Sequence, residues 1–390
     1  MIWIGFGFII IWLIAGTIAN FRKKAAADKA DVKIAEGVDG PIEDDTPKYE
    51  SAKAYRDFLY DEVKNGADGN YYVKVYTKVS QEEIEEIGHG IDPFYGRITS
   101  YTFSTSTQQD GDGPVIRDKY MSVNFDFVRS EEAYVYDSIV NGKEIPADKT
   151  NAIRLKEFCE KFLEENITSE MSDYDKELFI HDYIVENCVY ATNPEVGQAR
   201  TAYGCLVERS ATCEGYTKAT ALLLRLSGVA VRLVDGYVKE LLATTSDAGP
   251  NHMWNQVKIN GAWYNLDVTW DDPTGESGGL IHLYMNVSDE MFSYTHRFDE
   301  GSIREECTSM DENYYVKNNT IFYDQASFEA YVRDRLESGD FDGIYCVISN
   351  LDISQDALYF VFEYDGVNKY KYFVSGDDAY KSFELIVNPK

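Results

Sequence analysis

Hydrophobic and polar side chains alternate in the first part of the chain, as they do in half-buried strands. Two sets of apolar residues each keep one parity: Val73, Val75 and Val79, and then Val123, Phe125 and Phe127. Because successive side chains of a strand point to opposite faces, each set predicts one buried sheet face. Residues 81–87 predict a short helix between them. Residues 49–147 are therefore expected to form a small α+β domain.

From residue 148 the apolar spacing changes to that of helices. One helical face carries Ala152, Leu155, Cys159 and Phe162. A second helix is expected to run through Val185, with Ser172 or Asp173 as its N-cap. A third has apolar residues at i, i+3, i+4 and i+7, namely Ala219, Leu222, Leu223 and Leu226. Gly228 follows this set, as is typical of the residue that ends a helix.

Two strands are predicted next, from His252 to Ile259 and from Trp263 to Trp270. The Asn260-Gly261 pair between them is a strong signal for a two-residue hairpin turn. If Ile259 pairs with Ala262, Asp267 lies on the same sheet face as His252, on the adjacent diagonal. Such neighbours are ~7–8 Å apart at the backbone, which a carboxylate and an imidazole can span.

The last part of the chain predicts another small α+β domain, over residues 310–390. An amphipathic helix is indicated by Phe328, Tyr331, Val332 and Leu336. Two strand-like runs, 358–364 and 370–375, flank Asp365-Gly366 and predict a hairpin. No catalytic group is evident in this domain or in residues 49–147.

The N-terminal segment has the character of a membrane anchor. Residues 1–19 contain no charged side chain, and this length is close to the ~20 residues of a membrane-spanning helix. A basic run, Arg22-Lys23-Lys24, follows the apolar stretch, whereas a cleaved signal peptide carries its positive charge before it. We therefore expect a single uncleaved transmembrane helix over residues 1–20 and a flexible tether over residues 21–48. The alternative is a buried core helix.

Two features of the sequence predict opposite orientations for this anchor. The positive-inside tendency would keep the basic run, and with it the body of the protein, in the cytoplasm. A net charge of −30 is instead typical of a surface-displayed domain, and we expect an extracytoplasmic body. The same charge repels phosphate backbones, so nucleic acid is not an expected partner.

The six cysteines form no CxxC pair, which argues against a structural zinc site or a disulfide framework. No cofactor and no metal is expected. Cys159, Cys188 and Cys346 lie in apolar segments and are best interpreted as small core residues. Cys213 differs, because its surroundings are polar and contain glycine; a core role or a bridge to Cys205 is the simpler alternative.

Cys213 is expected in the first turn of the third helix, with Ser210 or Thr212 as the cap. The unpaired N–H groups and the positive end of the helix dipole stabilise a thiolate there, and they can also hold the oxyanion of a tetrahedral intermediate. His252 and Asp267 complete the set of nucleophile, base and orienting carboxylate. Trp254 has the parity of His252 and is expected to wall this site.

Other polar residues of this region have simpler interpretations. Asn255 has the opposite parity to His252 and is expected to hold the backbone. His181 lies within a predicted helix and is expected to be a hydrogen-bonded structural histidine. Asp271 and Asp272 precede Pro273 and are expected to shape a turn. A role of these two aspartates in calcium binding is the minor alternative.

Residues 150–300 resemble the transglutaminase-like superfamily, in particular its bacterial, surface-attached members. The resemblance is carried by Ala202-Tyr203-Gly204-Cys205-Leu206-Val207, Thr212-Cys213-Glu214-Gly215-Tyr216, His252-Met253-Trp254-Asn255, Trp263-Tyr264-Asn265-Leu266-Asp267-Val268-Thr269-Trp270-Asp271 and, ahead of these, Ile180-His181-Asp182-Tyr183-Ile184. It implies a papain-like α+β core over residues 148–300, in which a helix bearing the cysteine packs on an antiparallel sheet.

The resemblance also implies roles for individual residues. Cys213 would be the nucleophile, His252 the base and Asp267 the orienter, and Tyr203 is a candidate for the second oxyanion donor. Met253 stands where a small residue is common in the family, and it would narrow the site.

These features predict an enzyme of the cell envelope that forms an acyl-enzyme on peptide or protein amides. Water would resolve the thioester in a peptidase or amidase, and an amine would resolve it in a protein-glutamine acyltransferase. The alternative is a catalytically silent module that keeps the fold for binding or scaffolding at the cell surface. A third interpretation, metal ligation by the cysteine, histidine and aspartate, predicts bound zinc.

Overall fold

The computed structural model describes residues 46–387 except 66–67, 106, 109–115, 118, 194–196, 239–250, 273–279, 300–301, 340–343, 350, 352, 354–355, 365–366, 368 and 377–380. The chain divides into two compact units, residues 1–157 and 158–390, which are described separately. No helix within the described residues is long and apolar enough to span a bilayer. The anchor predicted over residues 1–20 lies outside them, as does the tether up to residue 45, and both stay predictions. The predicted domain boundaries also stay predictions.

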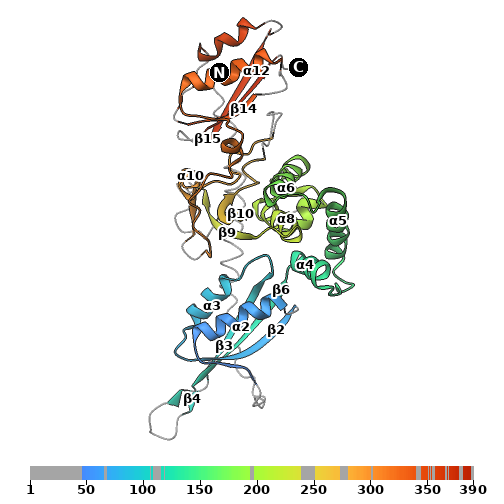
Figure 1. Ribbon diagram of the computed structural model, residues 1–390. Coiled ribbons are helices and arrows are strands. Elements are labelled where there is room, and N and C mark those ends of the chain that lie inside the picture. The colour runs from blue at the N-terminus through green and yellow to red at the C-terminus, as the bar shows by residue number, and fades with distance from the viewer. Residues whose placement is uncertain are drawn as a thin grey trace. The chain divides into compact units, whose positions relative to one another are not determined.

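The first unit is built on a four-stranded sheet with the strand order β1-β2-β6-β3. Its strands are β1 (Lys48–Tyr49), β2 (Gly69–Tyr76), β3 (Gly96–Ser104) and β6 (Tyr120–Arg129), with a separate short pair, β4 (Thr107–Gln108) and β5 (Ile116–Arg117). Val73 pairs with Val123, so the two predicted apolar sets share one core. Figure 1 shows α2 (Ala52–Asn65) and α3 (Gln81–His89) over one face of this sheet, and α4 (Glu131–Asn141) follows β6.

Helices dominate the next part of the chain, as the spacing of its apolar residues predicts. They are α5 (Thr150–Asn166), which contains the boundary between the units, α6 (Asp173–Asn187), α7 (Ala202–Leu206) and α8 (Cys213–Leu226). Ser172 caps α6, and its backbone N–H is bonded in return by Asp175. Beyond α8, Gly228 has the left-handed φ of +84° expected after a helix end.

An antiparallel sheet with the order β11-β10-β9-β12 packs beside these helices. Its strands are β9 (Val231–Val238), β10 (His252–Ile259), β11 (Ala262–Leu266) and β12 (His296–Phe298). Figure 1 shows α6 and α8 next to β9 and β10. The predicted hairpin register is confirmed, because Ile259 pairs with Ala262. Asn260 and Gly261 have φ of +49° and +89°, as the tight turn requires.

A third four-stranded sheet, with the order β13-β14-β16-β15, forms the C-terminal part. Its strands are β13 (Ile321–Phe322), β14 (Ile344–Ile348), β15 (Tyr370–Gly376) and β16 (Lys381–Val387), and α12 (Gln325–Glu337) follows β13. Two short helices, α10 (Asp289–Phe292) and α11 (Tyr314–Lys317), precede this sheet in the chain.

The predicted C-terminal hairpin is wrong. The 3₁₀ helix η1 (Asp356–Glu363) occupies its first strand, β15 pairs with β16, and the predicted turn at 365–366 lies outside the described residues. Leu358 and Val361, three residues apart, are both fully buried in the core of this part. That spacing fits a 3₁₀ helix, which an apolar run this short cannot distinguish from a strand.

Candidate active site

Cys213 is the first residue of α8, but the predicted cap of this helix is wrong. Thr212 occupies the N-cap position, and its side chain does not cap the helix. Its Oγ1 and its backbone N–H both donate to the carbonyl oxygen of Ala199, at 3.3 and 2.8 Å. Because no cap side chain occupies them, the first N–H groups of α8 remain available to an acceptor at the site.

The start of α8 is packed closely against the chain that precedes it. A Cβ on Gly215 would lie 2.5 Å from the carbonyl oxygen of Ala199 and 2.7 Å from the Cβ of Ala211. No side chain other than hydrogen fits there without displacing backbone. The glycine two residues after Cys213 therefore allows the helix to begin at this position.

His252 and Asp267 form the most closely bonded pair of the site. His252 is the first residue of β10, and its Nε2 lies 2.5 Å from Oδ2 of Asp267. The other carboxylate oxygen, Oδ1, accepts hydrogen bonds from the backbone N–H groups of Thr269 and Trp270, at 3.1 and 3.2 Å. β11 ends at Leu266, so Asp267 lies just beyond the strand, where its N–H donates to the carbonyl of Tyr284. These bonds fix the carboxylate and, through it, the imidazole.

The thiol of Cys213 lies close enough to the imidazole of His252 to contribute to the raised pKa of that ring. Because Nε2 of the ring is bound to Asp267, Nδ1 is the nitrogen left for the sulfur. Thr217, one turn further along α8, donates its hydroxyl to the carbonyl of Met253, at 2.9 Å. Asn255 donates to the carbonyls of Thr217 and Arg232, so it holds the backbone as predicted. The helix is thus joined to β10 next to His252.

The charges of the pair follow from these contacts. Burial alone would lower the pKa of His252, but the charge and hydrogen bond of Asp267, together with the contact to Cys213, raise this pKa to about 10. Burial acts to raise the pKa of Asp267, but the charge and bonds of His252 and the bond from His296 hold it well below its usual range. At neutral pH the site therefore contains an imidazolium bound to a carboxylate, with the sulfur of Cys213 nearby.

His296, on β12, is a site residue that sequence reasoning missed. Its Nε2 lies 3.1 Å from the same Oδ2 of Asp267, and its Nδ1 lies 2.8 Å from Oγ1 of Thr295. Burial lowers the pKa of His296 to about 4, so the ring is neutral. A neutral ring at this position donates from Nε2 to Asp267 and accepts from Thr295 at Nδ1. No motif marks this residue, because β12 joins the sheet through β9 and not through the hairpin.

Trp254 lies where the parity of β10 predicts it. Its ring stacks near the imidazole of His252, with centroids 6.0 Å apart, and it is 1% exposed. Gly236 pairs with His252 across β9, and a Cβ there would lie 2.3 Å from the indole. A glycine on the neighbouring strand therefore makes room for the tryptophan.

Tyr203 and Tyr190 are the two candidates for the second oxyanion donor. Tyr203, the predicted candidate, is buried in α7 at 2% exposure. The hydroxyl of Tyr190 lies near the backbone N–H of Cys213, which acts to lower the pKa of that hydroxyl. Tyr190 reaches this position because β7 (Val189–Tyr190) pairs with β8 (Ser210–Ala211), which directly precedes the cysteine helix. Burial raises the pKa of Tyr190, so the hydroxyl keeps its proton.

Asp271 and Asp272 lie in the bend that follows the turn at residues 268–270, in agreement with the turn predicted for them, and both also bond to distant residues. Asp271 is fully buried and accepts from the N–H of Tyr284 at 3.0 Å, and its Oδ2 lies 3.2 Å from Nε2 of His181. Asp272 accepts from the hydroxyl of Tyr216 at 2.5 Å. His181 is a buried, hydrogen-bonded residue of α6, as predicted.

A cysteine at the start of a helix, packed on an antiparallel sheet that supplies histidine and aspartate, is the arrangement of the papain-like cysteine enzymes. Residues 161–268 match the model of the transglutaminase-like superfamily. This part of the chain belongs to that superfamily, as its motifs predict.

Solved structures with similarity to the chain include two described as putative proteases and one described as a TGase. The "putative cysteine protease" from Cytophaga hutchinsonii is 15% identical and is matched over 48% of this chain and 70% of its own, with a TM-score of 0.25. The TGase is 13% identical over 60% of this chain and 61% of its own. The "putative protease" from Parabacteroides distasonis is 9% identical over 82% and 66%. Both of the latter also have a TM-score of 0.25. A search of curated proteins finds no match. The assignment to the superfamily therefore rests on the family model.

Proposed function

We propose that the protein is a cysteine-dependent acyl-transfer enzyme that acts on peptide or protein amides. Cys213 would be the nucleophile, His252 the general acid and base, and Asp267 the group that orients and charges the imidazole. The observation that carries the proposal is the bond between the Asp267 carboxylate and the His252 ring, together with the proximity of Cys213, which contributes to the raised pKa of that ring.

The first half of the reaction would form a thioester. The imidazolium of His252 stabilises the thiolate of Cys213, whose sulfur attacks the amide carbonyl. The carbonyl oxygen becomes an oxyanion that the N–H groups at the start of α8 can hold. The hydroxyl of Tyr190 lies beside the N–H of Cys213 and would be the second donor. As the C–N bond breaks, His252 gives its proton to the leaving amine.

The second half would release the acyl group. His252, now neutral, takes a proton from water or from an incoming amine, which attacks the thioester carbonyl. The C–S bond breaks and the sulfur leaves as the thiolate beside the re-formed imidazolium. Water gives a carboxylic acid, as in a peptidase, and an amine gives a new amide, as in a transglutaminase. The geometry of Cys213, His252 and Asp267 serves both outcomes.

Mass spectrometry of the products separates these outcomes. The full chain and the Cys213→Ala variant would each be incubated with cell-envelope peptides, with and without a primary amine donor. Cleaved or deamidated peptide with the wild type indicates hydrolysis, and amine-conjugated peptide indicates transfer. Both are expected to vanish in Cys213→Ala and to persist in His89→Ala, because His89 is an exposed residue of the first unit. The proposal is wrong if both products survive in Cys213→Ala. It is also wrong if neither product forms with the wild type, and that result favours the alternative of a catalytically silent binding module.

The place of the reaction is proposed from the sequence. An apolar segment at residues 1–20 would anchor the chain in a membrane, with the acidic body outside the cytoplasm. Substrates would then be proteins or peptides of the cell envelope.

A further inference from the structure

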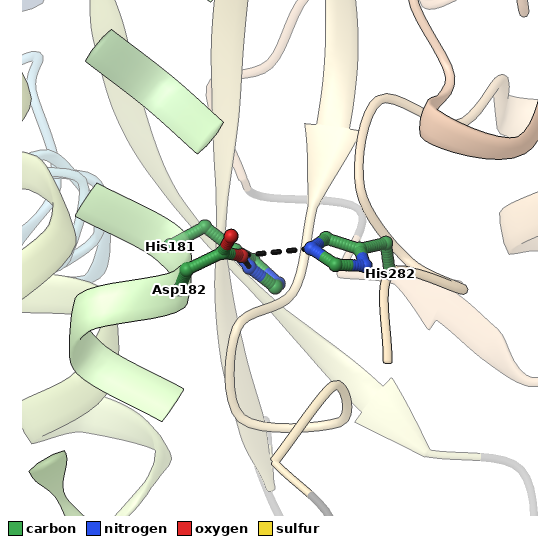
Figure 2. A group of neighbouring side chains, drawn as sticks. All are labelled: His181, Asp182 and His282. Carbon is green, nitrogen blue, oxygen red and sulfur yellow. Dashed lines mark hydrogen bonds and ion pairs between the residues drawn. The ribbon is translucent and has the colours of Figure 1, made fainter. Parts of the chain in front are cut away.

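A second group of histidines and aspartates lies apart from Cys213, between α6 and the loop that precedes α10. His181 and Asp182 are neighbours on α6, and His282 comes from the loop (Figure 2). Nδ1 of His181 lies 2.9 Å from Oδ1 of Asp182, and Nε2 of His282 lies 2.7 Å from the same oxygen. Two ring nitrogens therefore converge on one carboxylate oxygen.

The protons of His181 are the unusual feature of this cluster. Its Nδ1 faces Asp182, while its Nε2 lies 3.2 Å from Oδ2 of Asp271. Without an ion, a ring that carries a hydrogen on each nitrogen donates to both carboxylates. Burial acts to lower the pKa of His181, but the bonds and charges of Asp182 and Asp271 raise it to about 9. With an ion, Nε2 would keep its hydrogen for Asp271 and Nδ1 would bind the cation, which would lie between the same groups.

We propose that Nδ1 of His181, the carboxylate of Asp182 and Nε2 of His282 bind one divalent transition-metal ion of zinc's class. Two imidazoles and a carboxylate are a ligand set for zinc, at ~2.0–2.2 Å from the ion. The three ligand atoms already lie within 4.8 Å of one another. A water or another ligand would take the fourth position on the side of Asp182, whose side chain is 28% exposed.

The surroundings of the three ligands support this site. A metal-binding histidine usually donates its other N–H to a carboxylate, and Asp271 occupies that position for His181. Asp271 is itself held by the N–H of Tyr284. The ring of His282 stacks on Tyr314, with centroids 3.8 Å apart and an interplanar angle of 11°. The ligands are thus oriented by groups that do not touch the ion.

The position of the cluster indicates a structural role. The N–H of Asp271 donates to the carbonyl of Asp267, so the segment that supplies the proposed catalytic carboxylate also supplies the outer carboxylate of the metal site. An ion bound by His181, Asp182 and His282 would tie α6 to the loop before α10. This site is separate from the other buried group, His252, Asp267 and His296, which belongs to the proposed active site.

Zinc binding by the full chain, purified without a histidine tag and stripped by chelator, tests the proposal. Elemental mass spectrometry after dialysis against zinc is expected to find about one equivalent in the wild type. The same amount is expected in His89→Gln, which alters an exposed histidine, and in His296→Gln and Cys213→Ser, which alter the other buried cluster and the thiol. Asp182→Asn and His282→Gln are expected to lose the ion. Asp271→Asn is expected to weaken binding about 10–100-fold, as is usual for an outer carboxylate.

The thermal melting temperature provides a second measurement that does not depend on one variant. Zinc is expected to raise it in the wild type and not in Asp182→Asn, because an ion stabilises only the state that binds it. Asp182 is partly exposed, so this variant should fold. The proposal is overturned if the wild type holds no stoichiometric metal, if Asp182→Asn and His282→Gln both retain it, or if His296→Gln or Cys213→Ser abolishes it.

Discussion

At the scale of the residue, Asp267 is the centre of the proposed active site. Its Oδ2 receives bonds from His252 and His296, and its Oδ1 receives two backbone N–H groups. A buried carboxylate with four donors is held in one orientation and keeps its charge. The charge in turn keeps a proton on His252, which the proposed mechanism needs.

Asp267→Asn keeps the shape of the side chain and removes its charge. Because the carboxylate raises the pKa of His252, the variant should have a lower pKa at that ring. Wild-type activity that requires the imidazolium is present below pH 10 and is lost as the pH rises through about 10. In the variant this loss should begin at lower pH, and kcat/KM should fall by about 10²–10⁴-fold. The pH profile of kcat/KM measures both effects. An unchanged alkaline limb, or the same effect in the exposed control Asp311→Asn, would contradict this role.

His296 should act through Asp267 and not on the substrate. His296→Phe removes the N–H that reaches Oδ2. The loss of a bond to a buried charge is worth about 1.5–3 kcal/mol, so kcat should fall by about 10–150-fold while KM changes little. His296→Gln offers an amide donor and should recover part of the rate. Steady-state kinetics of both variants test this assignment. Equal losses in the two, or a change confined to KM, would refute it.

At the scale of the element, the β10–β11 hairpin was predictable and its surroundings were not. Asn260-Gly261 and alternating side chains define the register locally, and with it the approach of His252 to Asp267. Tyr190 lies on β7 and His296 lies on β12. Both strands reach the site by pairing with strands whose position depends on the packing of distant parts of the chain. Sequence spacing carries no information about such contacts.

The cap of α8 shows why a local rule can fail. Thr212 has a side chain able to cap the helix, but the carbonyl of Ala199 takes its hydroxyl. The choice between these partners depends on the tertiary position of residue 199. In the C-terminal part, η1 was mistaken for a strand because its apolar run was too short to define a period.

Two threonines on α8 provide a matched test of how this helix is joined to β10. Thr217 donates to the carbonyl of Met253, whereas the buried hydroxyl of Thr220 has no hydrogen-bond partner among the described residues. Thr217→Val should lower the free energy of unfolding by about 1 kcal/mol and reduce kcat. Thr220→Val should leave stability unchanged or raise it. Denaturant unfolding distinguishes them, and equal effects would contradict the proposed join.

Gly236 tests the packing behind His252. A Cβ there would lie 2.3 Å from the Trp254 ring and 2.5 Å from the carbonyl of Arg297. Gly236→Ala should therefore destabilise the fold by about 1–3 kcal/mol in denaturant unfolding. Gly69→Ala, where nothing lies within 4 Å, should change stability by less than about 0.5 kcal/mol. If Gly236→Ala leaves the free energy of unfolding unchanged, the indole of Trp254 is free to move.

At the scale of the whole molecule, the transglutaminase-like core is one part of a longer acidic chain. The family match covers residues 161–268, whereas the first unit and the C-terminal sheet lie outside it, as does the segment proposed as an anchor. Because a net charge of −30 repels phosphate backbones, nucleic acid is not an expected partner, and this stays a prediction.

Membrane attachment is tested by deleting residues 1–20. The full chain should sediment with membranes and resist extraction by high salt and alkaline carbonate, because an apolar helix and not charge would hold it. The shortened chain should be released. Protease added outside intact cells should digest the body if it is extracytoplasmic. A full chain that salt releases, or a shortened chain that stays bound, would contradict the anchor.

The central claim is that His252 activates the thiol of Cys213, and the most direct measurement is the rate of alkylation of each cysteine at mildly acidic pH. Cys213 is partly exposed and the other five cysteines are buried, so we expect fast modification of Cys213 alone. His252→Ala should abolish that reaction, and His89→Ala should leave it unchanged. Equal labelling of all six cysteines, or undiminished labelling of Cys213 in His252→Ala, would contradict the account.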